Sequence, residues 1–245
     1  MKKYISLFLA ALMLLSLLAG CGKKSDGGDG TRTLVLRNTA GLSTNDPHAT
    51  TNTHDYTVFE NIYEGLYDLN EATGGYDLRL AEKVEANDDA TEYIVTLKQG
   101  VKFHNGETMT ADDVVFSYAH AQKDAHMGSY CRPLDHVEKV DDYTVKIVMN
   151  QPFSPIGHML HKVKIMSKKG VEELGNDFGK VPNKVGTGPY MWDENNYNPL
   201  SSWSAVAFED YHRGKAKIEK ITWNVIADDT SAITALQNGE LDYMV

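Results

Sequence analysis

Histidine is the residue type in this sequence best suited to binding a metal ion or transferring a proton at neutral pH. Five of its nine histidines could contribute to a metal site: His48, His54, His126, His158 and His161. Neutral imidazole suits nickel and similar metals, and His158 and His161, three residues apart, would share one face of a helix. No cysteine or carboxylate completes a compact ligand set beside them, so their spacing alone supports a metal site only weakly.

A pair of adjacent carboxylates, Asp112 and Asp113, offers acid–base chemistry as a second possibility. Thr110 stands three residues before Asp113, and an apolar run begins at Val114. This spacing is typical of a capping box, and acids in the first turn suit the positive end of a helix. Acid–base chemistry would require surroundings that move the two pKa values apart. We therefore predict a structural role at the start of a helix.

The motifs of covalent catalysis are absent from the sequence. It contains no Gly-x-Ser-x-Gly elbow, no His-Glu-x-x-His pair and no catalytic-cysteine signature. A nucleophile beside its base is the minimum that such enzymes need. A lipid-anchored hydrolase is therefore disfavoured, and we predict a protein that is not an enzyme and needs no cofactor.

Cys21 is the residue whose position predicts a covalent modification. Lys2 and Lys3 precede an apolar run from Ile5 to Leu18, which is typical of a secretory signal peptide. Ala19 and Gly20, directly before Cys21, resemble the bacterial lipobox, in which the cysteine thiol receives a diacylglyceryl group. The sequence predicts a signal peptide over residues 1–20 and a lipid anchor on Cys21; an ordinary signal peptide with a chance cysteine is the alternative.

The segment after Cys21 predicts a flexible tether over residues 21–32, because it is rich in glycine and polar residues. The only other cysteine is Cys131, so a lipid-modified Cys21 leaves no intrachain disulfide. Loss of Lys2 and Lys3 with the leader changes the formal charge from −10 to −12. Such an acidic chain is unsuited to nucleic acid and to broad electrostatic binding of anionic lipid. We predict an extracytoplasmic protein held by its anchor.

Periodicity predicts both strands and helices. Strands are expected at 34–36, 66–69, 93–97 with a continuation to 103, 143–149, 201–208 and 221–226, and from 190 onward. Helices are expected from Asn52 or Thr53 to Gly65, after Thr110, at 156–160 and 171–174, and from 228–230 to Gly239. In the last helix Ile233 and Leu236 are expected to face inward. Residues 241–245 have a strand pattern, so the sequence is expected to be truncated.

Six segments in a fixed order resemble one protein family. They are Glu64–Tyr67, Leu80–Glu82, Tyr93–Glu107, Thr110–Ser117, Val185–Tyr190 and Ala235–Asp242. Together they resemble the extracellular solute-binding proteins, family 5, of oligopeptide, dipeptide and nickel ABC importers. The sequence departs from the usual pattern at Glu209–His212, although Tyr211 is kept.

The resemblance implies a mixed α/β fold of the type II periplasmic-binding-protein kind. The chain would form one lobe of a two-lobed Venus flytrap, whose lobes close on a ligand by hinge motion. Residues 33–63 and 185–245 would form the main sheet subdomain, and residues 64–184 a smaller inserted subdomain. Such a lipoprotein captures an oligopeptide or dipeptide outside the membrane and delivers it to ABC permease subunits. The protein would be anchored to the cell membrane, either in the periplasm or at the surface of a Gram-positive cell.

The resemblance places ligand contacts along the loop after the first strand and at the start of the next helix. Thr44, Asn45, Asp46 and Tyr56 are the candidates there, and the aromatic ring of Tyr56 could stack on a peptide group. The family's glycines are expected to serve backbone geometry, and we predict no resident metal. Two alternatives keep the fold: a nickel or metal-chelate-binding protein, and a lipid-anchored peptide receptor for signalling.

Overall fold

The computed structural model describes residues 32–244, so the predicted leader, the anchor Cys21 and nearly all of the tether lie outside the described residues. Within this range no helix has both the length and the apolar character needed to cross a bilayer. The elements, in chain order, are β1 (Thr33–Asn38), α2 (Thr53–Ile62), β2 (Tyr67–Asn70), β3 (Gly75–Leu78), β4 (Ala81–Ala86), β5 (Glu92–Leu97), α3 (Ala111–Lys123), β6 (Leu134–Asp141), β7 (Thr144–Met149), α4 (Gly157–Lys162), α5 (Lys168–Leu174), β8 (Tyr190–Asn198), β9 (Ser202–Ala207), β10 (Lys220–Val225) and α6 (Asp229–Asn238).

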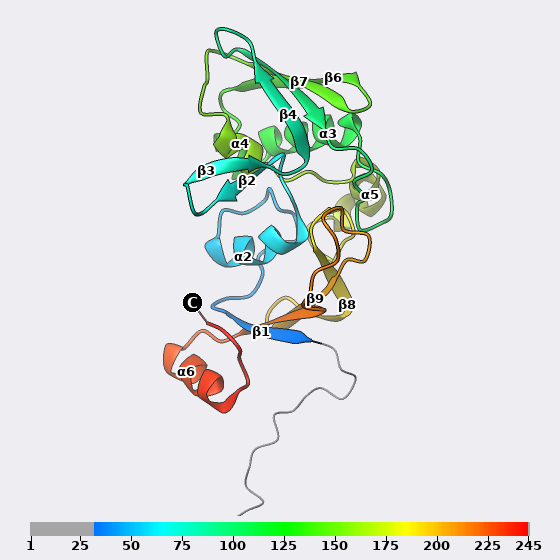
Figure 1. The fold of residues 1–245 in the computed structure, drawn as a ribbon. Helices are drawn as coiled ribbons and strands as arrows, with labels where there is room; N and C mark the ends of the chain where they lie inside the picture. The colour runs from blue at the N-terminus through cyan, green and yellow to red at the C-terminus, as the bar shows by residue number, and fades with distance from the viewer. Residues whose placement is uncertain (1–31, 245) are drawn as a thin grey trace, which may run out of the picture. The chain divides into compact units, whose positions relative to one another are not determined.

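The first sheet is mixed and has the order β1-β10-β9-β8. β1 runs parallel to β10, and the other pairs are antiparallel. Trp192, Trp203 and Trp223 are buried on it and pack in one core with Phe59 and Ile62 of α2. Figure 1 shows α2 between β1 and the β2–β3 hairpin.

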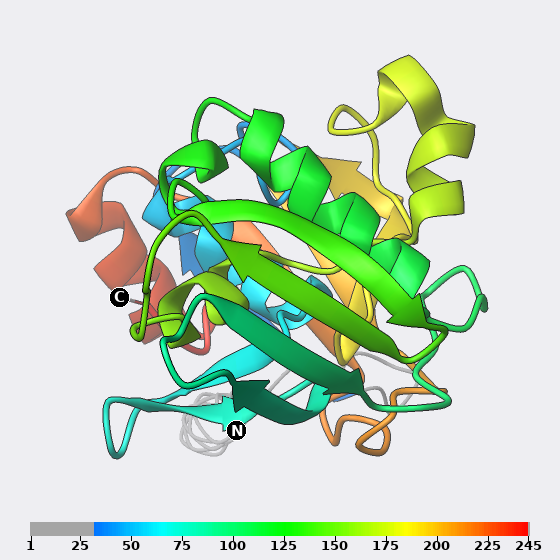
Figure 2. The same ribbon diagram turned by 90° about the horizontal axis from the view of Figure 1, so that it is seen from above.

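The second sheet is antiparallel, with the order β4-β5-β7-β6. In its strands β5 and β7 every second residue is buried and the residues between are more accessible, as the period-two pattern predicts. Helix α3 lies along one face of this sheet (Figure 2) and buries Val114 and Tyr118 in the same core. The predicted capping box at its start is confirmed: Asp113 Oδ2 accepts a hydrogen bond from the Thr110 backbone N–H at 2.9 Å. Asp112 forms an ion pair with Lys139.

The glycines of the matching segments have the architectural role that the sequence predicts. Gly100 and Gly106 have φ values of 73° and 87°, which side chains disfavour. A Cβ on Gly186 would lie 2.2 Å from the Ile62 carbonyl oxygen, so this loop can approach α2 only because it has no side chain there.

Glu64, two residues after the end of α2, is buried and forms hydrogen bonds with several segments. Its carboxylate accepts hydrogen bonds from Thr187 Oγ1 at 3.0 Å, Tyr211 Oη at 2.8 Å and His212 Nε2 at 2.9 Å. Burial alone would raise the pKa of Glu64, but the contacts with His212, Arg79 and Tyr211 together outweigh it and the pKa lies below its usual value. Tyr211, the residue kept where the sequence departs from the family pattern, is therefore part of the architecture.

Helix α6 corrects one expectation. Ile233 and Leu236 are 47% and 38% exposed, whereas Ala232 and Ala235 are buried against β1 and its surroundings. The small alanine side chains let the helix pack close to β1. This close packing, and not the burial of the largest apolar side chains, decides which face of α6 turns inward.

The stretch after α6 also differs from its prediction. The expected strand from residue 241 is reduced, among the described residues, to a single parallel bridge between Leu36 and Tyr243. Two backbone hydrogen bonds accompany it, from Arg37 N to Tyr243 O and from Asp242 N to Val35 O. The segment therefore lies along the edge of β1 without forming a regular strand.

Candidate functional site: two pockets beside helix α2

The exposed side of α2 carries Thr53, Thr57 and Glu60, at spacings of four and three residues that place them on one stripe. The opposite side carries Val58, Phe59 and Ile62, which are buried. The apolar side fixes the helix on the first sheet, and its polar stripe therefore faces outward. A pocket lies on each side of this stripe.

The first pocket, here called the sheet pocket, has a volume of about 420 Å³. Its lining residues come from the ends of β1 and β10, the start of α2 and the last described residues: Leu36, Arg37, Asn38, Thr39, Thr53, His54, Thr57, Trp223 and Tyr243. β1 and β10 are parallel, and their carboxyl ends meet here. That edge is where open α/β sheets bind ligands.

The second pocket, here called the hairpin pocket, lies between α2, the β2–β3 hairpin and α4. It measures about 470 Å³ and is lined by Thr53, Tyr56, Thr57, Glu60, Asp68, Leu69, Glu71, His161 and Lys162. Thr53 and Thr57 line both pockets. The two pockets therefore border the same stretch of helix.

Tyr56 gives the hairpin pocket an aromatic wall. The Lys162 ammonium lies 4.5 Å from the centre of its ring, which is cation–π distance. Burial raises the pKa of the Tyr56 phenol well above its usual value, so the group stays a neutral donor. Its hydroxyl oxygen is buried and has no hydrogen-bond partner within residues 32–244.

Charged groups surround the base of the hairpin pocket. The Lys164 ammonium, on a side chain only 2% exposed, lies 2.8 Å from Glu60 Oε2. Arg79 forms an ion pair with Asp68 through Oδ2. His161 Nε2 lies 3.8 Å from Glu60 Oε1, beyond hydrogen-bond distance. Burial, followed by the charge of Lys164, lowers the pKa of His161, so its imidazole is neutral at neutral pH.

Another group of metal-ligating residues, Asp46, His48 and His120, lies where α3 meets the loop after β1. His120 Nε2 lies 2.8 Å from Asp46 Oδ2, and Asp46 Oδ1 accepts the His48 backbone N–H at 2.9 Å. Burial would raise the pKa of Asp46, but the interactions with His120 and His48 together outweigh it and the pKa is lowered. The hydrogen bond to Asp46 raises the pKa of His120. These two residues form an ion pair that holds α3 against the loop.

His48 is unsuited to a metal because of the hydrogen bond on its far side. Its Nε2 accepts the Lys164 backbone N–H at 3.1 Å, so the proton of the neutral ring sits on Nδ1. A metal ion on Nδ1 would require that proton to move to Nε2. Two N–H groups, those of Nε2 and of the Lys164 backbone, would then face each other without an acceptor. Burial lowers the pKa of His48 to about 4, so the ring also stays neutral. Its Nδ1 is buried without a hydrogen-bond partner among the described residues, whereas its Nε2 and both oxygens of Asp46 are engaged.

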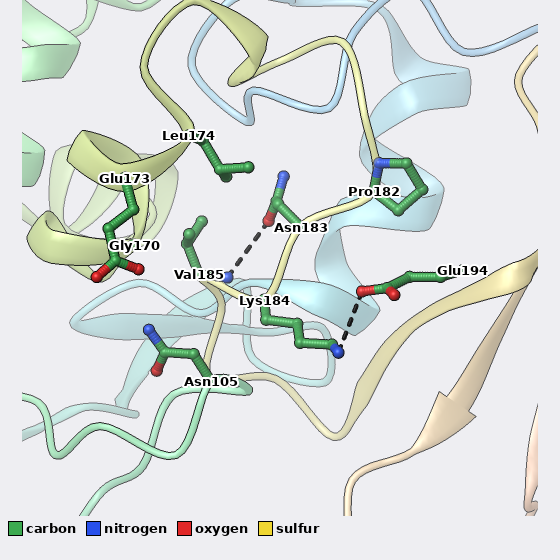
Figure 3. A pocket seen from close by; sticks show the side chains of 9 residues that line it. All are labelled: Asn105, Gly170, Glu173, Leu174, Pro182, Asn183, Lys184, Val185 and Glu194. Carbon is green, nitrogen blue, oxygen red and sulfur yellow. Dashed lines mark hydrogen bonds and ion pairs between the residues drawn. The ribbon is translucent and has the colours of Figure 1, made fainter.

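Figure 3 shows a third pocket, of about 240 Å³, beside α5 and the segment before β8. Its polar side chains are largely engaged with one another. Lys184 and Glu194 lie 3.1 Å apart, and Asn183 Oδ1 accepts the Val185 backbone N–H at 3.4 Å. This pocket therefore offers fewer free polar groups to a ligand than the two beside α2.

The four residues predicted to contact a ligand lie in two places. Tyr56 lines the hairpin pocket. Asn45 and Asp46 are buried, and Asn45 Nδ2 donates to Tyr197 Oη at 2.7 Å. Thr44 Oγ1 donates to the Gly179 carbonyl at 3.2 Å and accepts the Asp46 backbone N–H. Ligand contact by these residues stays a prediction; in the structure Thr44, Asn45 and Asp46 hold the loop in place.

Sequence reasoning missed several lining residues. Thr53, Thr57 and Glu60 were detectable, because their spacing marks a polar stripe on a helix with a buried opposite face. Asp68 and His161 were not, because they come from a hairpin and a helix far away in the sequence. His161 was singled out with His158, but His158 is exposed and hydrogen-bonded to Tyr76.

Comparison with known proteins identifies the class of protein. Residues 76–245 match the family described as bacterial extracellular solute-binding proteins, family 5 Middle, and the chain belongs to this family. Members of the family are binding proteins, which confirms both the resemblance and the prediction that this protein is not an enzyme. The family is extracellular by its description, in agreement with the predicted extracytoplasmic location.

Individual relatives and solved structures to which the chain is similar are also binding proteins. The glutathione-binding protein GsiB of Salmonella paratyphi A is 31% identical, over 96% of this chain and 45% of its own length. The binding protein MoaA of A. tumefaciens, solved with mannopinic acid, has a TM-score of 0.80 and 31% identity over 87% of this chain and 45% of its own. The oligopeptide-binding protein AppA of Bacillus subtilis, solved with a nonapeptide, has a TM-score of 0.79 and 26% identity over 86% and 43%. The predicted fold class is confirmed, and the chain spans about half the length of the relatives it matches.

Proposed function

We propose that this protein captures peptides outside the cell membrane and delivers them to the permease of an ABC importer. The observation that carries the proposal is the family membership together with relatives that bind glutathione and a nonapeptide. The two pockets along α2 supply a suitable surface. The sheet pocket offers Leu36 and Trp223 for apolar side chains, and the threonines between the pockets offer hydroxyls to a peptide backbone.

We further propose that residues 33–63 and 185–245 act as one subdomain and residues 64–184 as another. The first sheet draws its strands only from residues 33–38 and 190–225, and the second only from residues 81–149. A ligand on the polar stripe of α2 would contact both, because the sheet pocket and the hairpin pocket share that stripe. Tyr56, from the predicted set, would contact the ligand from the hairpin pocket.

Peptide binding tests the proposal directly. The natural gene product, purified from its host, is titrated by calorimetry with glutathione and with a series of di- to nonapeptides. At least one peptide should bind saturably, and Tyr56→Ala should weaken that binding about tenfold by removing an aromatic contact of about 1.4 kcal/mol. Leu200→Ala, at a side chain that is 79% exposed and lines neither pocket, is the matched control. A product that binds no peptide, or a Tyr56→Ala variant that binds as well as the parent, would contradict the proposal.

The lipid anchor is a separate part of the proposal and has its own test. The sequence Leu18–Cys21 and the glycine-rich tether support lipid modification of Cys21. Cells expressing the chain with radiolabelled palmitate should label the parent and leave Cys21→Ser unlabelled. Two acyl chains hold a protein stably at a bilayer, so the variant should also leave the membrane fraction. Equal labelling of both proteins would show that Cys21 is not the anchor.

A further inference from the structure

The hairpin pocket contains a second group of residues with the composition of a metal site. Glu60, Asp68 and His161 each offer one ligand atom, and these atoms all lie within 4.8 Å of one another. Two carboxylate oxygens and an imidazole nitrogen form a donor set suited to first-row divalent metals such as Zn²⁺ and Ni²⁺. Three different elements supply them: α2, β2 and α4.

Each of the two carboxylates, on Glu60 and Asp68, has one oxygen in an ion pair with a basic side chain. Lys164 holds Glu60 through Oε2, which leaves Oε1 toward His161. Arg79 holds Asp68 through Oδ2, and Asp68 Oδ1 makes no hydrogen bond within the described part of the chain. Carboxylates that ligate metals are commonly fixed by such outer contacts. Because each of these two carboxylates has one oxygen engaged and the other free, they can ligate an ion without breaking an existing ion pair.

The third donor is the imidazole of His161. The His161 side chain is 8% exposed and lines the pocket, yet its Nδ1 has no hydrogen-bond partner among residues 32–244 and its Nε2 is 3.8 Å from Glu60. The imidazole is therefore not committed to any hydrogen bond within the described part of the chain. Nε2, which faces Glu60 Oε1, is free to ligate an ion while the proton of the neutral ring stays on Nδ1.

Nearby cations reduce the attraction of Glu60, Asp68 and His161 for a metal ion but do not cancel it. Lys164 and Arg79 offset Glu60 and Asp68, and Lys162 lies over Tyr56. Glu71, at the exposed side of the pocket, forms no ion pair with any other described residue. An ion held by three protein ligands in a pocket of about 470 Å³ also keeps positions open for water or another donor.

We propose that Glu60, Asp68 and His161 form a binding site for a divalent transition-metal ion, Zn²⁺ or Ni²⁺, in the hairpin pocket. Oxygen-preferring Mg²⁺ would bind poorly, because one of the three donors is an imidazole nitrogen. The proposal does not depend on which solute the protein carries, since the probe is the metal alone.

The test measures metal binding by equilibrium dialysis and calorimetry with ZnCl₂ and NiCl₂ on the untagged full chain in mild detergent. Every version carries Cys21→Ser, so that no free thiol at that position binds the metal. The parent should bind one equivalent of metal in the presence of excess Mg²⁺. His161→Gln and Asp68→Asn should each weaken binding by at least about 100-fold, because loss of a direct ligand exceeds the 10–100-fold loss typical of an outer contact.

A histidine on the surface provides the matched control. His136 is exposed and lies 2.9 Å from Asp135 and 3.9 Å from Glu138, so it has similar neighbours without a pocket. His136→Gln should bind metal like the parent, and thermal melting should show all variants folded. The proposal is overturned if the parent binds no stoichiometric metal, if His161→Gln and Asp68→Asn both bind like the parent, or if His136→Gln removes the binding.

Discussion

The group Asp46, His48 and His120 and the group Glu60, Asp68 and His161 are built from the same residue types but differ in where their hydrogen bonds go. In the first group, called here the closed cluster, His48 accepts a backbone N–H and His120 contacts Asp46 at 2.8 Å. In the second, called the open cluster, His161 has no such partner, and each carboxylate has one engaged oxygen. Each cluster contains one buried imidazole Nδ1 without a partner among the described residues, on His48 and on His161. The clusters differ because the other nitrogen of His48 accepts a backbone N–H, whereas neither nitrogen of His161 makes a hydrogen bond within the described residues.

The two clusters also differ in their surroundings. The closed cluster lies between α3 and the loop after β1, with Phe116 and Phe178 against the His120 ring. The open cluster borders a pocket of about 470 Å³. A ligand can therefore reach the open cluster, whereas the closed cluster holds α3 against the loop after β1.

Replacement of each buried histidine by leucine should give the largest difference between the clusters. In the closed cluster, His48→Leu leaves the Lys164 backbone N–H buried without an acceptor, and we expect a loss of up to about 3 kcal/mol in the free energy of unfolding. In the open cluster, His161→Leu removes a ring that makes no hydrogen bond within the described residues, so the change should stay below about 1 kcal/mol.

Chemical denaturation of both variants, followed by tryptophan fluorescence, measures the two losses. The three tryptophans lie in the core of the first sheet and report its unfolding. Equal losses for His48→Leu and His161→Leu would break the comparison, because they would show that the hydrogen bonds do not distinguish the two sites.

The ion pair of the closed cluster should make its stability depend on pH. The pKa of His120 is raised in the folded state, so the stability from its protonation is fully present below about 6.5, the unfolded value, and is lost as pH rises through the folded pKa. The pKa of Asp46 is lowered, so its contribution is present above the unfolded value of 3.8 and is lost as pH falls through the folded pKa. Both contributions are therefore present between about pH 4.5 and 6.

Asp46→Asn should cost about 1.5 kcal/mol within that window and less as the pH rises through the raised pKa of His120, because the parent then loses its ion pair. Urea denaturation at pH 5.5, 7 and 9 checks this. Glu71→Gln, at an exposed carboxylate beside the open cluster, is the control and should change stability little at each pH. A cost of Asp46→Asn that is the same at all three values would show that the two residues do not act as an ion pair.

Local patterns predicted the local parts of this fold. Alternation located β7, and the spacing of Thr110 and Asp113 located the start of α3, because both depend only on neighbours in the chain. The order β4-β5-β7-β6 was out of reach, since β4 and β6 alternate poorly and are mostly exposed. The inward face of α6 was predicted wrongly, because packing against β1 favoured alanine over larger apolar residues.

The candidate site shows the same division between local and long-range information. Tyr56 was predicted because the family resemblance places ligand contacts at the start of this helix, and Glu60 follows it at a spacing of four on the same helix. The open cluster forms only when α4 and the β2–β3 hairpin meet α2, so no pattern within one element contains it. Likewise, the loop at Thr44 to Asp46 has polar residues suited to a ligand, and most of their side-chain groups form hydrogen bonds within the protein. Asn45 Oδ1 is the exception, because it is buried without a partner among the described residues.

A third group of carboxylates, at the start of α3, tests whether the comparison extends beyond histidine clusters. Asp113 resembles the closed cluster, because it accepts backbone N–H groups from Thr110 and from Lys168, both at 2.9 Å. Burial raises its pKa despite these bonds. We expect Thr110→Ala to lower the free energy of unfolding by about 1 kcal/mol, the usual value of a lost helix cap. Peptide and metal binding, measured well below the melting temperature, should match those of the parent. A large loss of either binding with the stability intact would show that a hydrogen-bonded carboxylate group can still form part of a ligand site, and the distinction between closed and open clusters would then fail.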